Sequence, residues 1–571
     1  MNSKQRLRTR IILICLLIAA GGLGSSLYWT QVVRGSTYAT RADKQYEKPQ
    51  ATLFDRGTIF FEAKDGTRAA AATVASGYLI FLNPKNLIDA NVAYEALSHY
   101  IKIDKEEFLR KATKKDDPYE ELLHRVPEET AESIKGLSIK GVGVAKESWR
   151  TYPGEELAAH ALGLIGENKE GTVEGRYGLE RTYQDVLKRS QASGGADLFA
   201  GLFGNIRESV FGSSKSVGGS IVTTIEPTVE KYLEKILKQT SETWKPDEIG
   251  AIIIDPHTGE IVAMSSLPSY DPNDISNIKD PGIFSNPLVE HVYEMGSIMK
   301  PITMAVGLDT GAITPNSTYN DTGTMTLNSK KISNFDGVAR GVVKVQEILS
   351  QSLNVGAATV ALKVGRIDFV KYFNSFGLGG KTGIDQPNEA AGLIGNLEKG
   401  QDIEIATAAY GQGIAVSPVA MARSLSVLAN GGHLIVPHLV KGVEYTDGTS
   451  KKIAPPEGAL ILKKDTTDEV TRMLVTVVDT ALRKGALKNE HYTIAAKTGT
   501  AQIPDPVNKG YYTDRYLHSF FGYFPAYNPK FLVFMYQTHP KGAQYASETL
   551  AEPFSEISKF LIDYYNIPPD R

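Results

Sequence analysis

The sequence has only one cysteine, Cys15, among its 571 residues, so no disulfide can form within the chain. It also lacks the HExxH pattern of zinc proteases and the GxSxG turn of α/β-hydrolases. Neither sign of charge is in excess, because 62 Lys and Arg residues stand against 65 Asp and Glu residues and the net charge is −3. These absences leave no argument for a metal site, a cofactor or a nucleic-acid partner.

One stretch lacks charge altogether. Residues 11–33, "IILICLLIAAGGLGSSLYWTQVV", follow a basic tail, residues 1–10, that contains no acidic side chain. This run of 23 residues is long enough to cross a bilayer as a helix, and its basic flank predicts a cytoplasmic N-terminus with the rest of the chain outside the membrane. A cleaved signal peptide is the alternative. No small-x-small cleavage site is evident near Trp29, which favours a retained, single-pass transmembrane anchor.

Composition predicts two domains after this anchor. Residues 34–220 are mixed and polar, contain no evident catalytic pattern, and end in the Gly- and Ser-rich stretches "SQASGGADLFAGLFGN" and "VFGSSKSVGGS". Residues 221–571 begin with a strand and a helix, continue through a β-hairpin around "DPHTGE", and close with the strands "HSFFGYFPA" and "KFLVFMYQTH" and a helix. This order of elements predicts an α+β domain with a largely antiparallel sheet.

A serine and a lysine three residues apart, Ser297 and Lys300 in "EMGSIMKPIT", suggest an activated nucleophile. Positions i and i+3 share a helix face, and Pro301 requires the helix to start close to Ser297. The alternative is that Ser297 only caps a core helix. A second such pair, in "SNIK" at 276–279, is followed by the turn signal "DPG" and need not share a helix face.

Two further patterns decide between these interpretations. Ser352 and Asn354 form a Ser-x-Asn pattern, and Lys497-Thr498-Gly499-Thr500 follows the strand-like "YTIAA". Together with Ser297 and Lys300, they resemble the Ser-x-x-Lys, Ser-x-Asn and Lys-Thr-Gly motifs of the penicillin-binding protein and serine β-lactamase superfamily. A second Lys-Thr-Gly, 381–383, lies among glycines and turn-forming residues, so we expect Lys381 in a surface loop.

Other segments are similar to class B penicillin-binding proteins in particular. "DRGTIFF" and "EGRYGLERTYQDVL" resemble their non-catalytic domain, and "DPHTGEIVAMSSLPSYDPN", "GQGIAVSPVAMA" and "HSFFGYFPAYNPK" resemble their transpeptidase domain. The resemblance implies a non-catalytic pedestal or dimerisation domain over residues 34–220. Over residues 221–571 it implies a transpeptidase domain with a central antiparallel sheet flanked by helices. One departure is Met295, where class B members usually carry proline.

The resemblance also implies a role for each motif residue. A serine hydroxyl needs a base, and a lysine with an ordinary pKa of about 10.4 serves as one only if burial or a nearby cation keeps it neutral. Ser297 would be the nucleophile, Lys300 its base and Ser352 a proton relay, with Asn354 holding a lysine or the substrate backbone. Lys497, Thr498 and Thr500 would bind the donor carboxylate, Gly499 would let a substrate strand approach, and the N–H groups of Ser297 and Thr500 would form the oxyanion hole.

The implied activity is crosslinking of peptidoglycan stem peptides through a serine acyl-enzyme, with β-lactams as inhibitors. A β-lactamase, an elongation-type class B enzyme and a β-lactam sensor or scaffold without transpeptidase activity are the alternatives. "YGQGIAVSP" and the ending "YYNIPPD" favour the septal cell-division type. A membrane-spanning glycosyltransferase and other cell-wall synthesis proteins are the partners that the resemblance implies.

Overall fold

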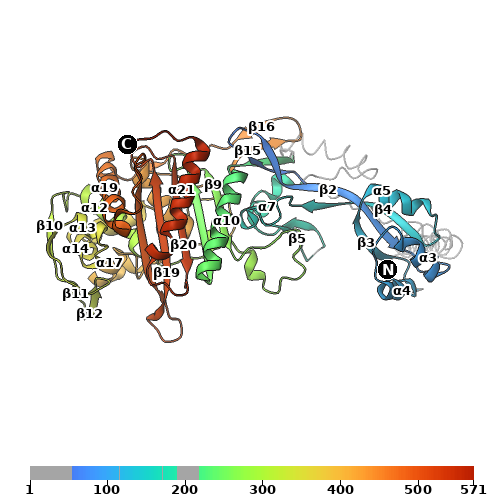
Figure 1. Cartoon of the computed structure of the whole chain (residues 1–571), viewed down its shortest axis with the longest axis horizontal. Helices are drawn as coiled ribbons and strands as arrows, with labels where there is room; N and C mark the ends of the chain where they lie inside the picture. Colours follow the sequence, from blue (N-terminus) through green and yellow to red (C-terminus); the bar gives the residue numbers. More distant parts are fainter. Residues whose placement is uncertain (1–54, 115, 170, 189–217, 455) are drawn as a thin grey trace, which may run out of the picture. The chain divides into compact units, whose positions relative to one another are not determined.

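The computed structural model describes residues 55–114, 116–169, 171–188, 218–454 and 456–571 (Figure 1). The basic tail at 1–10 and the predicted anchor at 11–33 lie outside these residues. Within the described ranges, no helix is both long enough and apolar enough to span a membrane. The chain forms two compact units, one comprising Val74–Arg150 and the other Arg56–Thr73 together with Thr151–Arg571. These two units are not separated by a single boundary near residue 220. The domain boundary predicted there from composition stays a prediction.

The smaller unit packs three helices with three strands around its own core. Asp89 and Asp104 cap the first two helices by accepting backbone N–H groups, which satisfies donors that an isolated helix end leaves free. The core includes Ile80, Leu97 and Phe108. The elements are the second half of β2 (Arg68–Leu82), α3 (Ala90–Ser98), α4 (Lys105–Ala112), β3 (Glu120–Val126), α5 (Glu128–Gly136) and β4 (Val142–Thr151).

The larger unit begins with a sheet that joins distant parts of the sequence. Its strands are β16 (Ser450–Lys452), β15 (Val440–Tyr445), β7 (Gly219–Thr223), β1 (Ile59–Glu62) and the start of β2, in that order. Beside it, the "DRGTIFF" and "YGLERT" segments meet through a buried ion pair, in which Arg56 Nε lies 2.5 Å from Glu180 Oε2. The short elements here are α6 (Ala159–Leu162), β5 (Ile165–Glu167), β6 (Val173–Gly175), α7 (Gly178–Thr182) and α8 (Gln184–Leu187).

A five-stranded antiparallel sheet forms the centre of the larger unit. Its strand order is β18 (Ala495–Pro504), β19 (Tyr511–Phe524), β20 (Phe531–Thr538), β8 (Glu248–Ile254) and β9 (Ile261–Leu267). The predicted hairpin around "DPHTGE" is the β8–β9 pair. Strand β18 lies at the edge of the sheet, so one side of it is open to another extended chain.

Helices cover both faces of this sheet. On one face lie α10 (Pro227–Trp244) and α21 (Ala551–Tyr565), which also contact each other (Figure 1). On the other lie α18 (Pro418–Ala429) and α19 (Lys464–Thr476). Helix α10 is the helix predicted near the start of residues 221–571; Pro227 lies in its first turn, and Glu226 accepts the Val229 N–H at 2.7 Å. The α+β prediction for this region, an antiparallel sheet flanked by helices, is confirmed.

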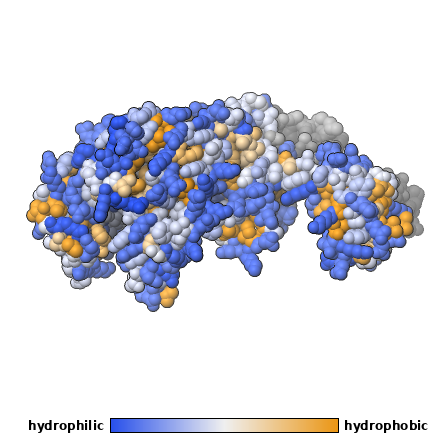
Figure 2. All heavy atoms as spheres, viewed as in Figure 1, coloured by the Kyte–Doolittle hydropathy of each residue, from blue (hydrophilic) through white to orange (hydrophobic). Residues whose placement is uncertain are grey.

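The remaining elements form a helical region beside β18 and short peripheral pairs of strands. The visible face of the larger unit is mostly hydrophilic (Figure 2). The helices are α11 (Pro287–Glu290), α12 (Lys300–Asp309), α13 (Gln346–Ser350), α14 (Asn354–Val364), α15 (Arg366–Ser375), α16 (Asn396–Lys399), α17 (Asp402–Ala408), α20 (Ala546–Thr549) and the single turns η2 (Pro281–Phe284), η3 (Gly296–Met299), η4 (Val477–Ala481) and η5 (Leu482–Gly485). The strands are β10 (Thr318–Asp321), β11 (Thr324–Leu327), β12 (Lys330–Ser333), β13 (Gly341–Lys344), β14 (His433–Leu434) and β17 (Ala459–Leu460).

Candidate active site

Ser297 lies in the 3-10 turn η3, which leads directly into α12. With three residues per turn, this geometry places Ser297 and Lys300 on the same side of the chain. Pro301 falls in the first turn of α12, where the N–H that it lacks would have no intrahelical partner. Ser297 is half-buried and lines a cavity. Its hydroxyl has no hydrogen-bond partner among the described residues, so it is free to meet a substrate.

Close backbone contacts hold this turn against the edge strand. Gly296 has φ +63°, and a Cβ there would lie 3.0 Å from the carbonyl carbon and oxygen of Thr500. A Cβ on Gly499 would lie 2.3 Å from Ser519 Oγ and 2.7 Å from the Met295 carbonyl oxygen. The Ser519 hydroxyl donates to that same oxygen at 2.7 Å. The missing side chain of Gly499 therefore makes room for the chain's own η3 turn, whereas the resemblance implied room for a substrate strand.

Lys300 is completely buried, and its amine contacts the Ser-x-Asn motif. Its Nζ donates to the Ser352 carbonyl oxygen at 2.6 Å, to Ser352 Oγ at 3.1 Å and to Asn354 Oδ1 at 2.8 Å. Burial, and then the charge of Lys497, lower the pKa of Lys300 well below its ordinary value. The environment thus favours the neutral amine that a serine nucleophile needs as a base. No hydrogen bond joins Lys300 to Ser297 in the described part of the chain.

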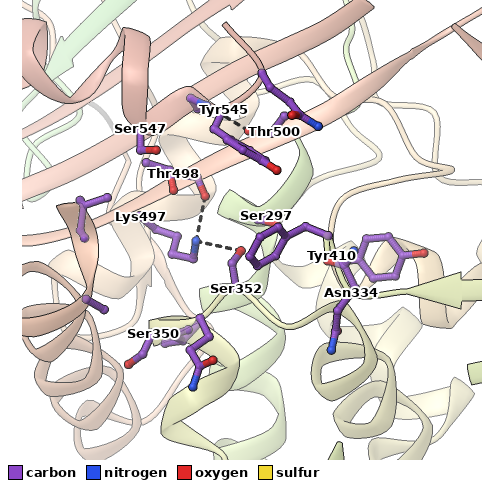
Figure 3. Close-up of a pocket in the computed structure, with 18 of the residues that line it drawn as sticks. Ser297, Asn334, Ser350, Ser352, Tyr410, Lys497, Thr498, Thr500, Tyr545 and Ser547 are labelled. Atoms are coloured by element: carbon purple, nitrogen blue, oxygen red, sulfur yellow. Dashed lines mark hydrogen bonds between the residues drawn. The ribbon is translucent and has the colours of Figure 1, made fainter. Parts of the chain in front are cut away.

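Ser352 lies between two lysines in a strained turn. Its φ of +55° falls in the left-handed region, which is unfavourable for a serine and is characteristic of functional sites. Lys497 Nζ also donates to Ser352 Oγ, at 3.1 Å (Figure 3). An oxygen that accepts from both amines still has its own proton to donate. Ser352 is therefore placed to pass a proton across the cavity.

Asn354 and Lys497 complete this group. Asn354 starts α14, and its Nδ2 donates to the Ser333 carbonyl oxygen at 2.9 Å, which fixes Oδ1 towards Lys300. Lys497 is 2% exposed, donates to the Thr498 carbonyl oxygen at 2.9 Å, and has its pKa lowered to about 7 by burial. The structure thus brings together residues that are almost 200 positions apart in the sequence.

The cavity has a volume of about 740 Å³ and is lined by motif residues on several sides. Ser297, Ser352, Asn354, Lys497, Thr498 and Thr500 all line it. Residues outside the three motifs line it as well, among them Asn334, Tyr410, Gln544 and Tyr545. Of these four, only Tyr410 had a sequence signal, since it is the first residue of "YGQGIAVSP"; the other three lie in segments without a motif.

The second Ser-x-x-Lys pattern, at 276–279, and the second Lys-Thr-Gly, at 381–383, lie away from this cavity. Lys381 is exposed in an irregular loop, as the sequence predicts. Ser276 is exposed in a turn, where its hydroxyl donates to Asp274 Oδ1 at 2.8 Å. Neither residue lines the cavity. In the described part of the chain, no cluster of three or more His, Cys, Asp or Glu side chains could hold a metal ion.

Two family models match the sequence. Residues 249–559 match the penicillin-binding protein transpeptidase domain, and residues 55–218 match the penicillin-binding protein dimerisation domain. The chain belongs to the penicillin-binding protein transpeptidase family. The first match spans more than half of the chain and contains all the motif residues.

Individual relatives of this penicillin-binding protein cover nearly its whole length. It is 28% identical over 563 residues to stage V sporulation protein D of Bacillus subtilis, covering 97% of this chain and 84% of that protein. It is 26% identical over 570 residues to the peptidoglycan D,D-transpeptidase FtsI of Escherichia coli K12, covering 97% of this chain and 91% of that protein.

Solved structures share its fold. Penicillin-binding protein 2X from Streptococcus thermophilus aligns with a TM-score of 0.73 at 22% identity, covering 90% of this chain and 79% of that one. Penicillin-binding protein 3 from Mycobacterium tuberculosis, solved in complex with aztreonam, aligns with a TM-score of 0.69 at 22% identity. The alignment covers 91% of this chain and 98% of that one. At these identities the likeness concerns the fold alone.

Proposed function

We propose that this chain is a class B penicillin-binding protein that crosslinks peptidoglycan as a serine D,D-transpeptidase. The observation that carries the proposal is the pair of buried lysines, Lys300 and Lys497, which contact one hydroxyl beside the cavity that Ser297 lines. The family match and the D,D-transpeptidase relatives support the same reaction. β-lactams, which mimic the donor peptide, would acylate the same serine.

The first half of the reaction is acylation. Neutral Lys300 accepts the Ser297 proton while Oγ attacks the carbonyl carbon of the penultimate D-alanine. The bond to the terminal D-alanine nitrogen breaks, and that nitrogen receives a proton through the Ser352 hydroxyl. The N–H groups of Ser297 and Thr500 stabilise the oxyanion. The close approach of the Gly296 backbone to the Thr500 carbonyl supports this pairing, because it holds the turn that carries Ser297 against β18.

The second half transfers the acyl group to an amine. A side-chain amine of a neighbouring stem peptide attacks the ester carbonyl and loses a proton, and the Ser297 oxygen regains one as it leaves. Lys497, Thr498 and Thr500 hold the donor carboxylate in the first half, since a cation and two hydroxyls suit a carboxylate. The open edge of β18 supports an extended donor peptide by backbone hydrogen bonding.

The cellular role that we propose is septal synthesis during cell division. The segment "YGQGIAVSP" and the FtsI relatives support this role. A role in sporulation is the second candidate, because the Bacillus subtilis relative covers 97% of this chain. An elongation-type enzyme and a non-catalytic sensor or scaffold are the remaining alternatives.

The topology that we propose follows from the sequence. Residues 11–33 anchor the protein in the cell membrane, residues 34–220 form a non-catalytic pedestal or dimerisation domain, and residues 221–571 form the transpeptidase domain outside the cytoplasm. The uncharged run and its basic flank support this arrangement. A membrane-spanning glycosyltransferase and other cell-wall synthesis proteins are the partners that fit it.

The reaction can be tested with a stem pentapeptide that ends in D-Ala-D-Ala, together with an amine acceptor. We expect the protein to release D-alanine and to form the crosslinked dimer, both detected by mass spectrometry, and we expect Ser297→Ala to do neither. Release of D-alanine with only hydrolysed peptide would indicate a carboxypeptidase. No release at all from the folded protein would favour the sensor or scaffold.

A further inference from the structure

The segment Gln544–Ala546 forms one wall of the active-site cavity. Gln544, Tyr545 and Ala546 all line the cavity, and Tyr545 lies across it from the Ser352 turn (Figure 3). The Ala546 N–H donates to Thr500 Oγ1 at 3.1 Å. This hydrogen bond occupies a lone pair of the Thr500 oxygen, so the hydroxyl proton is directed elsewhere. A donor carboxylate in the cavity is the acceptor that would use it.

A buried histidine beneath the sheet edge holds this segment. His518 of β19 is the direct cross-strand partner of Thr500 and has no solvent exposure. Its Nε2 lies 3.1 Å from the Gln544 carbonyl oxygen, and its Nδ1 lies 2.9 Å from Thr549 Oγ1. Paired residues in an antiparallel ladder place their side chains on the same face, so His518 and Thr500 contact the same segment.

The partners of His518 define its tautomer. A carbonyl oxygen can only accept, so Nε2 carries the proton and Nδ1 accepts from the Thr549 hydroxyl. Burial lowers the pKa of His518 to about 4, which keeps the ring neutral at physiological pH. The ring therefore acts as a fixed bridge from β19 to Gln544 of the segment and to Thr549 at the end of α20.

We propose that His518 is a positioning residue for recognition of the donor carboxylate. It holds Gln544–Ala546 so that Ala546 orients the Thr500 hydroxyl, and Thr500 then donates to the carboxylate. This inference rests on the proposed transpeptidase function and adds a residue that itself does not line the cavity. It requires that loss of His518 weakens reaction with ligands that carry the carboxylate, and leaves other ligands nearly unaffected.

The chain offers a matched control in His160 of α6. His160 is also buried, its pKa is also lowered to about 4 by burial, and it also joins a hydroxyl to a carbonyl. Its partners are Ser266 Oγ at 3.2 Å and the Ile283 carbonyl oxygen at 2.9 Å, and it does not line the cavity. A general cost of losing a buried histidine should therefore appear equally in both variants.

The experiment compares a penicillin with its carboxyl methyl ester on the full-length protein in detergent. We expect His518→Ala to slow acylation by the penicillin at least about tenfold and acylation by the ester less than about threefold. His160→Ala should change neither rate by more than about threefold, although both variants should lower the melting temperature. His518→Gln, whose amide can still donate to the Gln544 carbonyl, should recover part of the loss.

Two results would overturn the proposal. If His518→Ala slowed penicillin and ester equally, the histidine would support the cleft as a whole and not the carboxylate contact. If neither rate changed in a folded His518→Ala protein, the histidine would not reach the site at all. Should His518→Ala fail to fold, Thr549→Val removes the donor to Nδ1 and must show the same selective loss. Failure of the proposed transpeptidase function would give a different result from failure of the His518 proposal, because penicillin would then not acylate even the unaltered protein.

Discussion

The side-chain amines of Lys300 and Lys497 both contact Ser352 Oγ, each at 3.1 Å. Two buried ammonium groups on one oxygen would repel each other strongly, and burial lowers the pKa of both. The pKa of Lys300 is lowered further, because the charge of Lys497 adds to its burial. We infer that Lys300 is the neutral amine and Lys497 the remaining cation, which matches a base beside Ser297 and a carboxylate contact on β18.

This relationship predicts the effect of removing Lys497. Lys497→Ala should slow β-lactam acylation at least about tenfold, the loss expected for roughly 1.4 kcal/mol of transition-state stabilisation. The variant should also shift the acidic limb of the pH–rate profile to higher pH. Without the neighbouring charge, the pKa of Lys300 rises towards its ordinary value, so a higher pH is needed to obtain the neutral amine. Stopped-flow acylation across a pH series measures both effects.

The control for this variant is the second Lys-Thr-Gly. Lys381→Ala removes an exposed loop lysine and should leave both the rate and its pH dependence nearly unchanged. If Lys381→Ala were impaired and Lys497→Ala acylated normally, the assignment of β18 as the substrate-binding edge would be wrong, together with the roles of Thr498 and Thr500.

A buried carboxyl on α10 predicts a pH dependence of stability. Glu230 has no solvent exposure; its Oε2 accepts the Met264 N–H at 2.8 Å, and Oε1 has no partner in the described part of the chain. Burial, and then Glu234, raise the pKa of Glu230 well above its ordinary value. The pKa of Glu234 is raised to about 7, with burial as the main cause.

The sign of the effect follows from proton binding. The folded state binds these protons more tightly than the unfolded state, so the stabilisation is present below the unfolded pKa of about 4.5 and is lost as pH rises through about 7. Glu230→Gln keeps an acceptor for Met264 and removes one titrating group. Its melting temperature should vary less than that of the unaltered protein between about pH 5 and 8. The exposed Glu242→Gln, on the same helix, should preserve the original slope. An unchanged slope in Glu230→Gln would contradict the assignment.

The proposed anchor predicts a protease digestion pattern in spheroplasts. Treatment of spheroplasts should digest the chain beyond about residue 35, because a basic tail such as residues 1–10 favours a cytoplasmic N-terminus. A tag placed before residue 11 should remain protected and should fractionate with the membrane. Protection of residues 221–571 would reverse the topology, and a released soluble protein would indicate a cleaved signal peptide.

Local sequence signals predicted the elements whose structure is determined locally. The β8–β9 hairpin follows from two runs rich in Ile, Val and Ala around "DPHTGE", and α10 follows from Pro227 and its apolar face. The left-handed conformation of Ser352 and the packing that requires Gly499 had no such signal, because both arise from contacts between distant segments. Tyr545 reaches the cavity partly for the same reason, since distant Thr500 and His518 contact its segment, in addition to the nearby Glu548 side chain that accepts the Tyr545 N–H.

The most direct test of the account is to map the residue that a fluorescent penicillin modifies. The protein, Ser297→Ala and Ser276→Ala are each labelled, digested and analysed by mass spectrometry. We predict a single adduct on the peptide that contains Ser297, full labelling of Ser276→Ala, and no labelling of Ser297→Ala. Persistent labelling of a folded Ser297→Ala protein, or an adduct at Ser276, would contradict the assignment of Ser297 as the nucleophile.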